Sequence, residues 1–165
     1  MRVFKFGGAS VKNAEAVKNV ASILKLFPNE KIVVVISAMG KITNALEKLT
    51  HAAFKEREKI AAVLEEIKKY HFEIMEQLFL DKSHPVFAEV SNTFVELEWA
   101  TEEEPNQSYD HTYDQIVSIG EILSTKIVSA YLNSCGVMNR WQDARDFIRT
   151  DNTYREGKVD WVLTE

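Results

Sequence analysis

The chain opens with two short apolar runs of β character, separated by a segment with helical periodicity. Residues 2–6 and 31–36 are the apolar runs, and the second is an almost continuous series of β-branched side chains. Between them, residues 11–27 carry apolar side chains at the i, i+3, i+4, i+7 spacing of one buried helix face. This order predicts a right-handed βαβ unit, whose second strand is covered on both faces of a parallel sheet.

Most of the following sequence has the pattern of amphipathic helices. Asn44 and Glu47 have the spacing of a capping box at an expected helix start, and Ser83-His84-Pro85 marks an expected break. The predicted elements are helices at about 44–80, 86–100 and 113–133, a loop at 101–110, and strands at 137–141, 147–150 and 159–163. The pattern therefore indicates an α/β fold with a mainly parallel sheet and a helix-rich insertion at about 44–104.

Composition narrows the class of protein. The chain has 165 residues, enough for one domain, and its formal charge of −5 without a basic stripe argues against a nucleic-acid partner. It contains no run of eighteen apolar residues and no signal-peptide pattern, so we expect no membrane partner. The single Cys135 excludes an internal disulfide, has no neighbouring base, and fits a protein of the reducing cytoplasm. The four histidines lack metal-ligand spacing, so we interpret them as surface or helix-side residues and predict no metal ligands.

The first candidate site follows the first predicted strand. Lys5 interrupts an apolar run that leads through Phe6 into Gly7 and Gly8, and Ser10 stands where a helix N-cap is expected. A lysine in or beside the core needs an anion to face, and glycine amides at a helix start can hold a phosphate. The alternative is an edge strand with a lysine that extends to solvent, followed by a plain glycine turn.

Two further candidate sites lie at the end of the second strand and inside a predicted helix. Ser37 and Thr43 supply hydroxyls that can bond a carboxylate or phosphate, although Thr43 or Asn44 can equally be a helix cap. Gly120 inside a helix indicates close approach by another group. Glu121 lies at or beside the apolar face without a cation at i±3 or i±4, so it either borders the core or meets a cationic ligand such as an amine.

A last polar segment, residues 141–151, alternates acids and arginines. Such a stretch is more often a loop held by its own ion pairs than a catalytic element, and we interpret it in that way.

Together these segments resemble the aspartokinases of the amino acid kinase family. The resemblance rests on four stretches in family order, at residues 5–11, 34–44, 118–121 and 143–151. It implies a three-layer αβα sandwich, with Lys5, Phe6, Gly7, Gly8 and Ser10 at the phosphates of ATP and Lys5 as the catalytic residue. It also implies that Ser37, Thr43 and Glu121 bind L-aspartate, with Glu121 at the α-ammonium group.

The same resemblance implies the reaction and its setting. The expected activity is ATP-dependent phosphorylation of the aspartate side-chain carboxylate, with Mg²⁺ accompanying the nucleotide, in lysine and threonine biosynthesis. Residues 1–165 resemble the N-terminal part of the kinase domain, without the nucleotide-binding half or the ACT domains, so we expect the chain alone to be inactive and the full-length protein to be a homo-oligomer. The sequence departs from the family at Ala9 and Ile42. The alternatives are another amino acid kinase with a different carboxylate or phosphate acceptor, or a non-catalytic anion-binding module.

Overall fold

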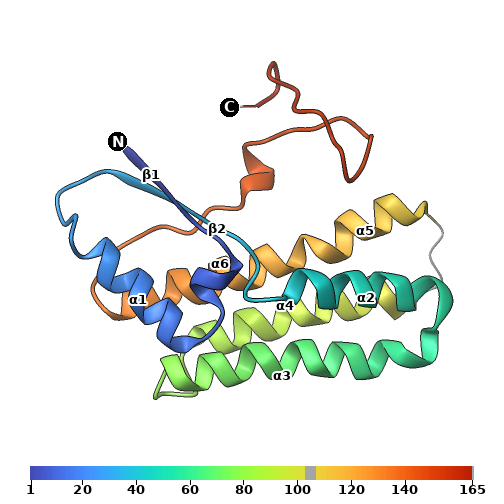
Figure 1. Cartoon of the computed structure of the whole chain (residues 1–165), viewed down its shortest axis with the longest axis horizontal. Coiled ribbons are helices and arrows are strands. Elements are labelled where there is room, and N and C mark those ends of the chain that lie inside the picture. The colour runs from blue at the N-terminus through green and yellow to red at the C-terminus, as the bar shows by residue number, and fades with distance from the viewer. Residues whose placement is uncertain (103–106, 165) are drawn as a thin grey trace.

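The computed structural model describes residues 1–102 and 107–164, and Figure 1 shows a small sheet beside a layer of long helices. The strands are β1 (Arg2–Phe6) and β2 (Ile32–Ile36). The α-helices are α1 (Ala14–Leu24), α2 (Ile42–Lys55), α3 (Ile60–Leu78), α4 (Pro85–Glu102), α5 (Tyr109–Val117) and α6 (Ile119–Ser134). Short 3₁₀ helices are η1 (Gly8–Val11), η2 (Arg57–Lys59) and η3 (Ala144–Asp146).

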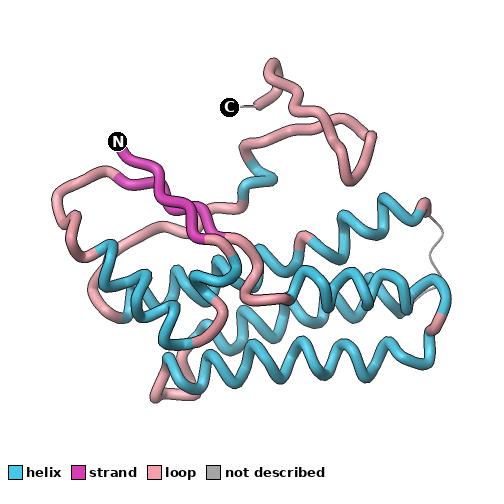
Figure 2. The backbone as a smooth tube through the Cα atoms, in the orientation of Figure 1, coloured by secondary structure: helices cyan, strands magenta, loops and turns pink. Residues whose placement is uncertain are grey.

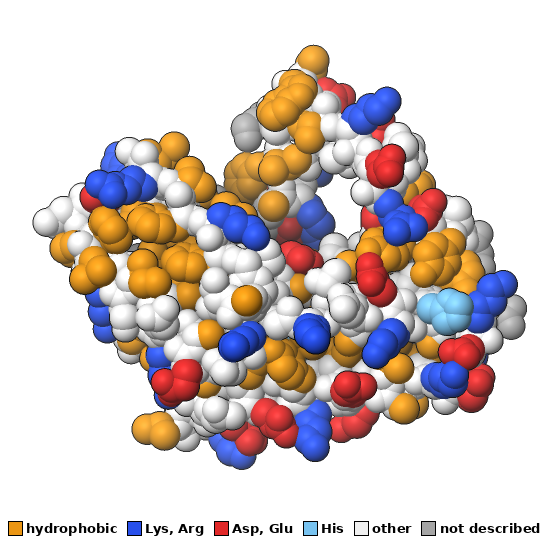
Figure 3. Space-filling view, in the orientation of Figure 1, with side chains coloured by type: hydrophobic (Ala, Val, Ile, Leu, Met, Phe, Trp, Pro, Cys, Tyr) orange, Lys and Arg blue, Asp and Glu red, His pale blue; other side chains and the backbone are white. Residues whose placement is uncertain are grey.

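The predicted βαβ unit is confirmed. Strands β1 and β2 pair in parallel, with Val3 opposite Val33 and Lys5 opposite Val35, and α1 connects them. The prediction that the second strand is covered on both faces is wrong for the described residues, because Val33 and Val35 are 44% and 48% exposed. The described helices pack against the other face, where Phe6 and Ile36 are buried. In Figure 3, hydrophobic side chains gather on the visible surface around β1 and β2.

The helix-rich insertion is confirmed, and its helices pack side by side. Helix α2 packs on α3 and α5, and α4 packs on α6 (Figure 1). Fully buried apolar side chains, among them Leu46, Leu49, Ile67, Phe94 and Leu123, form one continuous core between these helices and the sheet. Burial of their apolar surface stabilises the arrangement. No helix in the described ranges is both long and apolar enough to cross a membrane.

Several predicted helix boundaries are wrong. Helix α1 starts later than residue 11, because the Asn13 side chain accepts a hydrogen bond from the Ala16 amide and is the N-cap. Ser10 lies in η1 instead. Helix α2 starts at Ile42 after Lys41, so neither Thr43 nor Asn44 is its N-cap and Glu47 closes no capping box. The predicted helix 44–80 is divided at η2, and the helix 113–133 is divided at Ser118 into α5 and α6. Part of the predicted loop 101–110 lies outside the described residues.

The predicted strands after α6 are also wrong. Gly136, with φ +82°, follows the end of α6, and residues 137–164 contain only η3 and one isolated antiparallel bridge between Thr150 and Val159. Figure 2 shows this segment as a looped arm above the helices. The arm is attached to α5, because the Arg155 backbone N–H donates to the Asp114 carboxylate at 2.9 Å and the Arg155 guanidinium lies over the Tyr113 ring.

Candidate active site

The loops that follow β1 and β2 are in direct contact. The Gly40 amide donates to the Gly8 carbonyl at 3.0 Å, and the Ser37 amide donates to the Phe6 carbonyl at 3.1 Å. A side chain at Gly8 would not fit, because its Cβ would lie 2.8 Å from the carbonyl oxygens of both Ala38 and Gly40. The first and second candidate sites are therefore two walls of one site, at the carboxyl ends of adjacent parallel strands.

Lys5 lies on the open face of the sheet rather than in the core. Its side chain is exposed, so the ammonium lies beside the core, as in the alternative of an edge strand with a lysine that extends to solvent, while the neighbouring Phe6 is buried. The Lys5 Nζ nevertheless reaches the glycine loop, because a Cβ built on Gly7 would lie 3.3 Å from it. No carboxylate pairs with Lys5 in the described part of the chain. The cation is therefore available to an anionic ligand at the loop.

The loop also presents backbone donors. The amides of Gly7 and Gly8 find no acceptor among the residues that the structure describes, whereas the Ser10 amide donates to the Gly7 carbonyl at 2.8 Å. Ser10 itself is exposed. Two free N–H groups beside an ammonium suit the oxygens of a phosphate.

Two more lysines border the site, and the sequence analysis missed them. Lys41 directly follows Gly40, and the Lys12 Cβ lies 3.6 Å from the Cβ position of Gly40. Both side chains are exposed, and neither forms an ion pair with a described residue. The signal that could have found them is a lysine adjacent to each glycine-bearing loop. Together with Lys5 they make this edge of the sheet cationic in a chain of negative net charge.

The second loop places its two hydroxyls near the start of α2. Ser37 and Thr43 are both half-buried, one directly after β2 and the other in the first turn of α2. Neither hydroxyl is hydrogen-bonded to a residue within the described ranges. They are therefore free to bond a carboxylate oxygen at the helix N-terminus.

Helix α6 brings Glu121 to the same loop. The Ala38 amide donates to Glu121 Oε1 at 3.2 Å, across 83 residues of sequence, so Glu121 has a partner that its helical neighbours do not provide. The approach depends on Gly120, because a Cβ there would lie 2.9 Å from Leu46 Cδ1 and 3.0 Å from the Ala38 Cβ. The predicted close approach at this glycine is confirmed. Glu121 remains half-buried, with its other carboxylate oxygen available to a ligand.

The acidic and basic segment at residues 141–151 is a loop held by its own ion pair, as predicted. The Arg145 guanidinium makes bidentate contact with Asp143, with Nη2 to Oδ2 at 2.6 Å. This hydrogen bond holds the pKa of Asp143 below its usual range.

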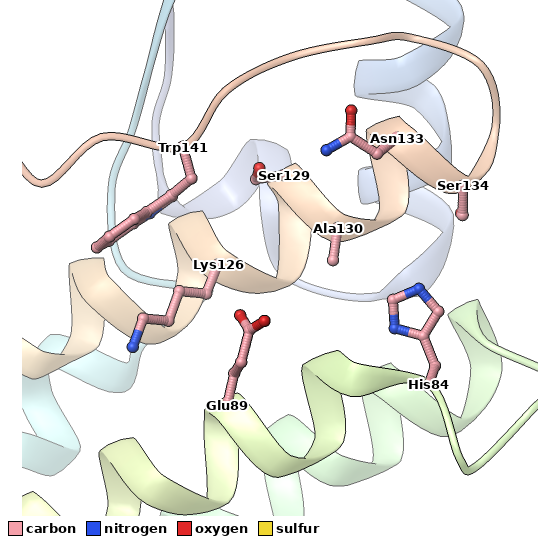
Figure 4. A pocket seen from close by; sticks show the side chains of 8 residues that line it. All are labelled: His84, Glu89, Lys126, Ser129, Ala130, Asn133, Ser134 and Trp141. Atoms are coloured by element: carbon pink, nitrogen blue, oxygen red, sulfur yellow. The ribbon is translucent and has the colours of Figure 1, made fainter.

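A separate groove of about 500 Å³ lies between α4 and α6 (Figure 4). It is lined by His84, Glu89, Lys126, Ser129, Ala130, Asn133, Ser134 and Trp141. Several of its polar groups already have protein partners: the Lys126 ammonium donates to Thr93 at 2.9 Å, and the Trp141 indole donates to Thr125 at 2.9 Å. None of the predicted site residues lines this groove.

The interpretation of the histidines is wrong for His71. Its ring is fully buried in α3, where Nδ1 bonds the Ile67 carbonyl at 2.8 Å. Burial lowers the pKa of His71 to about 4, so the ring is neutral. Across residues 1–102 and 107–164, no three His, Cys, Asp or Glu side chains come together in a group that could hold a metal ion.

These features define a class of protein. The profile of the amino acid kinase family matches residues 1–162, and the chain belongs to this family. The α/β fold with a parallel sheet is confirmed by crystal structures of Escherichia coli aspartokinase III, one in complex with lysine and aspartate and one with aspartate and ADP. Each matches 99% of the chain with a TM-score of 0.86 and 27% identity, and the chain covers 36% and 35% of them, respectively.

Within this family, the similar proteins are aspartokinases. Aspartokinase 1 of Arabidopsis thaliana, a chloroplastic protein, is 40% identical over 158 residues, and aspartokinase 2 is 38% identical over 157. These alignments include 91% of the chain but only 27% and 28% of the two relatives. The chain thus spans about a quarter of the length of these relatives.

Proposed function

We propose that the protein carrying this chain transfers the γ-phosphoryl group of ATP to the side-chain carboxylate of L-aspartate, giving 4-phospho-aspartate and ADP. The observation that carries the proposal is the meeting of three segments at one edge of the sheet. The loop after β1 supplies a free ammonium and free amides, the loop after β2 supplies free hydroxyls, and α6 supplies a carboxylate. One wall suits phosphate oxygens and the other suits an amino acid.

The charges support a different substrate at each of the two walls. Lys5 with the amides of Gly7 and Gly8 would hold the β- and γ-phosphates, with Phe6 and Ser10 framing the loop. Ser37 and Thr43 would bond a carboxylate of aspartate, and Glu121 would accept a hydrogen bond from its ammonium. The hydrogen bond that the Ala38 amide donates to Glu121 Oε1 supports this role, because it holds the carboxylate at the loop.

The reaction needs positioning more than proton transfer. An oxygen of the aspartate carboxylate attacks the γ-phosphorus, the bond from that phosphorus to the β-phosphate oxygen breaks, and ADP leaves with the electron pair. The nucleophile is already an anion, so no base is required, and Lys5 would neutralise charge on the transferred group. Magnesium would be held through the phosphate oxygens, since the described residues offer no cluster of ligands for it.

The proposal also covers the place of the chain within a longer protein. We infer that residues 1–165 are the N-terminal part of a kinase domain, so the 165-residue chain alone should form no aspartyl phosphate. A cytoplasmic location and a homo-oligomeric state stay predictions, and the names of the plant relatives place those proteins in chloroplasts.

The test measures aspartyl phosphate, trapped with hydroxylamine, and ADP formed by the full-length protein. Lys5→Met should lower kcat/KM about a hundredfold or more, as loss of a charge-stabilising donor does. The matched control is Lys25→Met, which replaces an exposed lysine at the end of α1 that forms no ion pair with a described residue, and it should leave kcat/KM unchanged.

Glu121→Gln separates the proposed acceptor from the alternatives. Succinate has the two carboxylates of aspartate but no ammonium. If Glu121 binds the ammonium, the wild-type protein should prefer aspartate to succinate, and Glu121→Gln should lose this preference. Turnover of another carboxylate, with none of aspartate, would indicate a different member of the family. Nucleotide binding without any turnover by the full-length protein would indicate an anion-binding module.

A further inference from the structure

Tyr70, in the middle of α3, contacts both glycine-bearing loops although it belongs to the helix-rich insertion. Its hydroxyl donates a hydrogen bond to the Lys12 carbonyl, 58 residues away and directly after η1. The same hydroxyl oxygen lies 2.5 Å from the position that a Cβ on Gly40 would occupy. One phenol group therefore touches the loop after β1 and the loop after β2.

Packing fixes the position of this phenol group. The Tyr70 ring is half-buried and meets the His71 ring edge-on, at 5.5 Å between centroids and an interplanar angle of 88°. His71 is fully buried and in turn meets the Phe94 ring of α4 at 5.7 Å. Burial raises the pKa of Tyr70, so the hydroxyl remains a donor at neutral pH. The contact to the loops thus comes from the helical core rather than from a freely rotating side chain.

We propose that Tyr70 is a positioning residue, which fixes the phosphate-binding loop relative to the acceptor-binding loop. This inference rests on the proposed function. Apart from the sheet itself, the two loops are joined by the hydrogen bond between the Gly40 amide and the Gly8 carbonyl, at 3.0 Å. Tyr70 adds a second link, through Lys12 on one loop and Gly40 on the other. Phosphoryl transfer depends on the alignment of donor and acceptor, so small displacements between these loops should affect the chemical step before they affect binding.

The test is Tyr70→Phe in the full-length protein, which removes the hydroxyl and keeps the ring. We expect kcat to fall about tenfold, while KM for ATP and KM for aspartate each change by less than about twofold. Calorimetric titration with ATP gives the fraction of competent sites, and kcat is expressed per competent site, so that partial unfolding does not imitate the effect. The control is Tyr113→Phe, which should leave kcat unchanged, because the Tyr113 hydroxyl donates to Glu47 of α2 at 2.7 Å rather than to either loop.

The outcomes separate this inference from the proposed function. An unchanged kcat per site in Tyr70→Phe, or the same loss in Tyr113→Phe, overturns the positioning role. If the wild-type protein forms no acyl phosphate, the proposed function fails. Amide hydrogen exchange then tests whether Tyr70 holds the two loops together. Exchange in residues 7–12 and 37–41 should be faster in Tyr70→Phe than in wild type, and equal exchange rates would overturn the inference.

Discussion

Replacing Gly8 by alanine tests directly whether the two loops pack as closely as the structure shows. The added Cβ would lie 2.8 Å from the Ala38 carbonyl oxygen and 2.8 Å from the Gly40 carbonyl oxygen. Carbon and oxygen atoms in proteins normally approach only to about 3.3 Å, so about 0.5 Å of movement is needed on two sides. Both obstacles are backbone atoms, and the Gly8 carbonyl is itself bonded to the Gly40 amide. The loops must therefore move apart together.

Two opposing terms decide the size of the effect. Overpacking of this kind costs about 1–3 kcal/mol, whereas glycine to alanine restricts the unfolded chain and stabilises by about 0.4–1 kcal/mol. The net change for Gly8→Ala is a loss of about 1–2 kcal/mol in the free energy of unfolding. Gly7→Ala is the matched control, since the Gly7 backbone is extended at φ −75° and, among the described residues, the added Cβ would lie close only to the flexible Lys5 Nζ, at 3.3 Å. This control should be neutral or slightly stabilised.

Thermal and denaturant unfolding of the two variants measures the difference. At about 2–4 °C per kcal/mol for a domain of this size, the melting temperature of Gly8→Ala should be several degrees below that of Gly7→Ala. ATP affinity should also fall in Gly8→Ala, because the displaced loop no longer presents its amides in the same place. Equal melting temperatures for the two variants would refute the close packing of the loops, and with it the shared site.

Three other predictions follow from burial and charge. Leu46→Ala should lower the free energy of unfolding by about 2–5 kcal/mol because Leu46 is fully buried, whereas Leu80→Ala, at a fully exposed residue, should change it by less than about 0.5 kcal/mol in the same denaturation assay. His71 has a pKa of about 4 in the folded chain and about 6.5 when unfolded, so its contribution to stability is complete above pH 6.5 and about 3 kcal/mol is lost by pH 4. His71→Leu should flatten this part of the stability profile, and an unchanged slope would contradict a neutral buried ring. Asp114→Ala removes the acceptor of the Arg155 amide, so limited proteolysis should cut the arm at residues 149–164 faster than in wild type, and equal rates would show that this contact does not hold it.

The parts of the fold that follow from local sequence were predicted correctly. The β-branched run and the apolar face of α1 specify a βαβ unit with little help from distant residues, and glycines mark both loops at the strand ends. Such loops meet at one edge of a parallel sheet, and here they are in direct contact through the Gly40 amide and the Gly8 carbonyl.

Two of the wrong predictions involve elements whose structure depends on distant contacts. No glycine or proline separates α2 from α3, but the Arg57 guanidinium bonds the carbonyls of Thr101 and Glu102 near the end of α4, and the chain turns there. The short apolar runs at 137–141, 147–150 and 159–163 resemble strands, yet a strand needs a neighbour to pair with. Within the described residues these runs find only the bridge between Thr150 and Val159.

In the candidate site, too, the sequence reveals features that depend on neighbouring residues but not contacts between residues far apart in the chain. The sequence marks Glu121 as unusual because no cation lies at i±3 or i±4, but nearby positions carry no information about an amide 83 residues away. Tyr70 gave no signal at all, since an aromatic residue in an amphipathic helix is ordinary. Its role becomes visible only when α3 is packed beneath the loops. Gly120 contributes through the side chain that it lacks. Without a Cβ at this position, α6 can approach Leu46 of α2, and that approach brings Glu121 to the Ala38 amide. The helix-rich insertion therefore determines the geometry of the site in two places, through Tyr70 beneath the loops and through Leu46 against Gly120, so changes in its core should alter catalysis as well as stability.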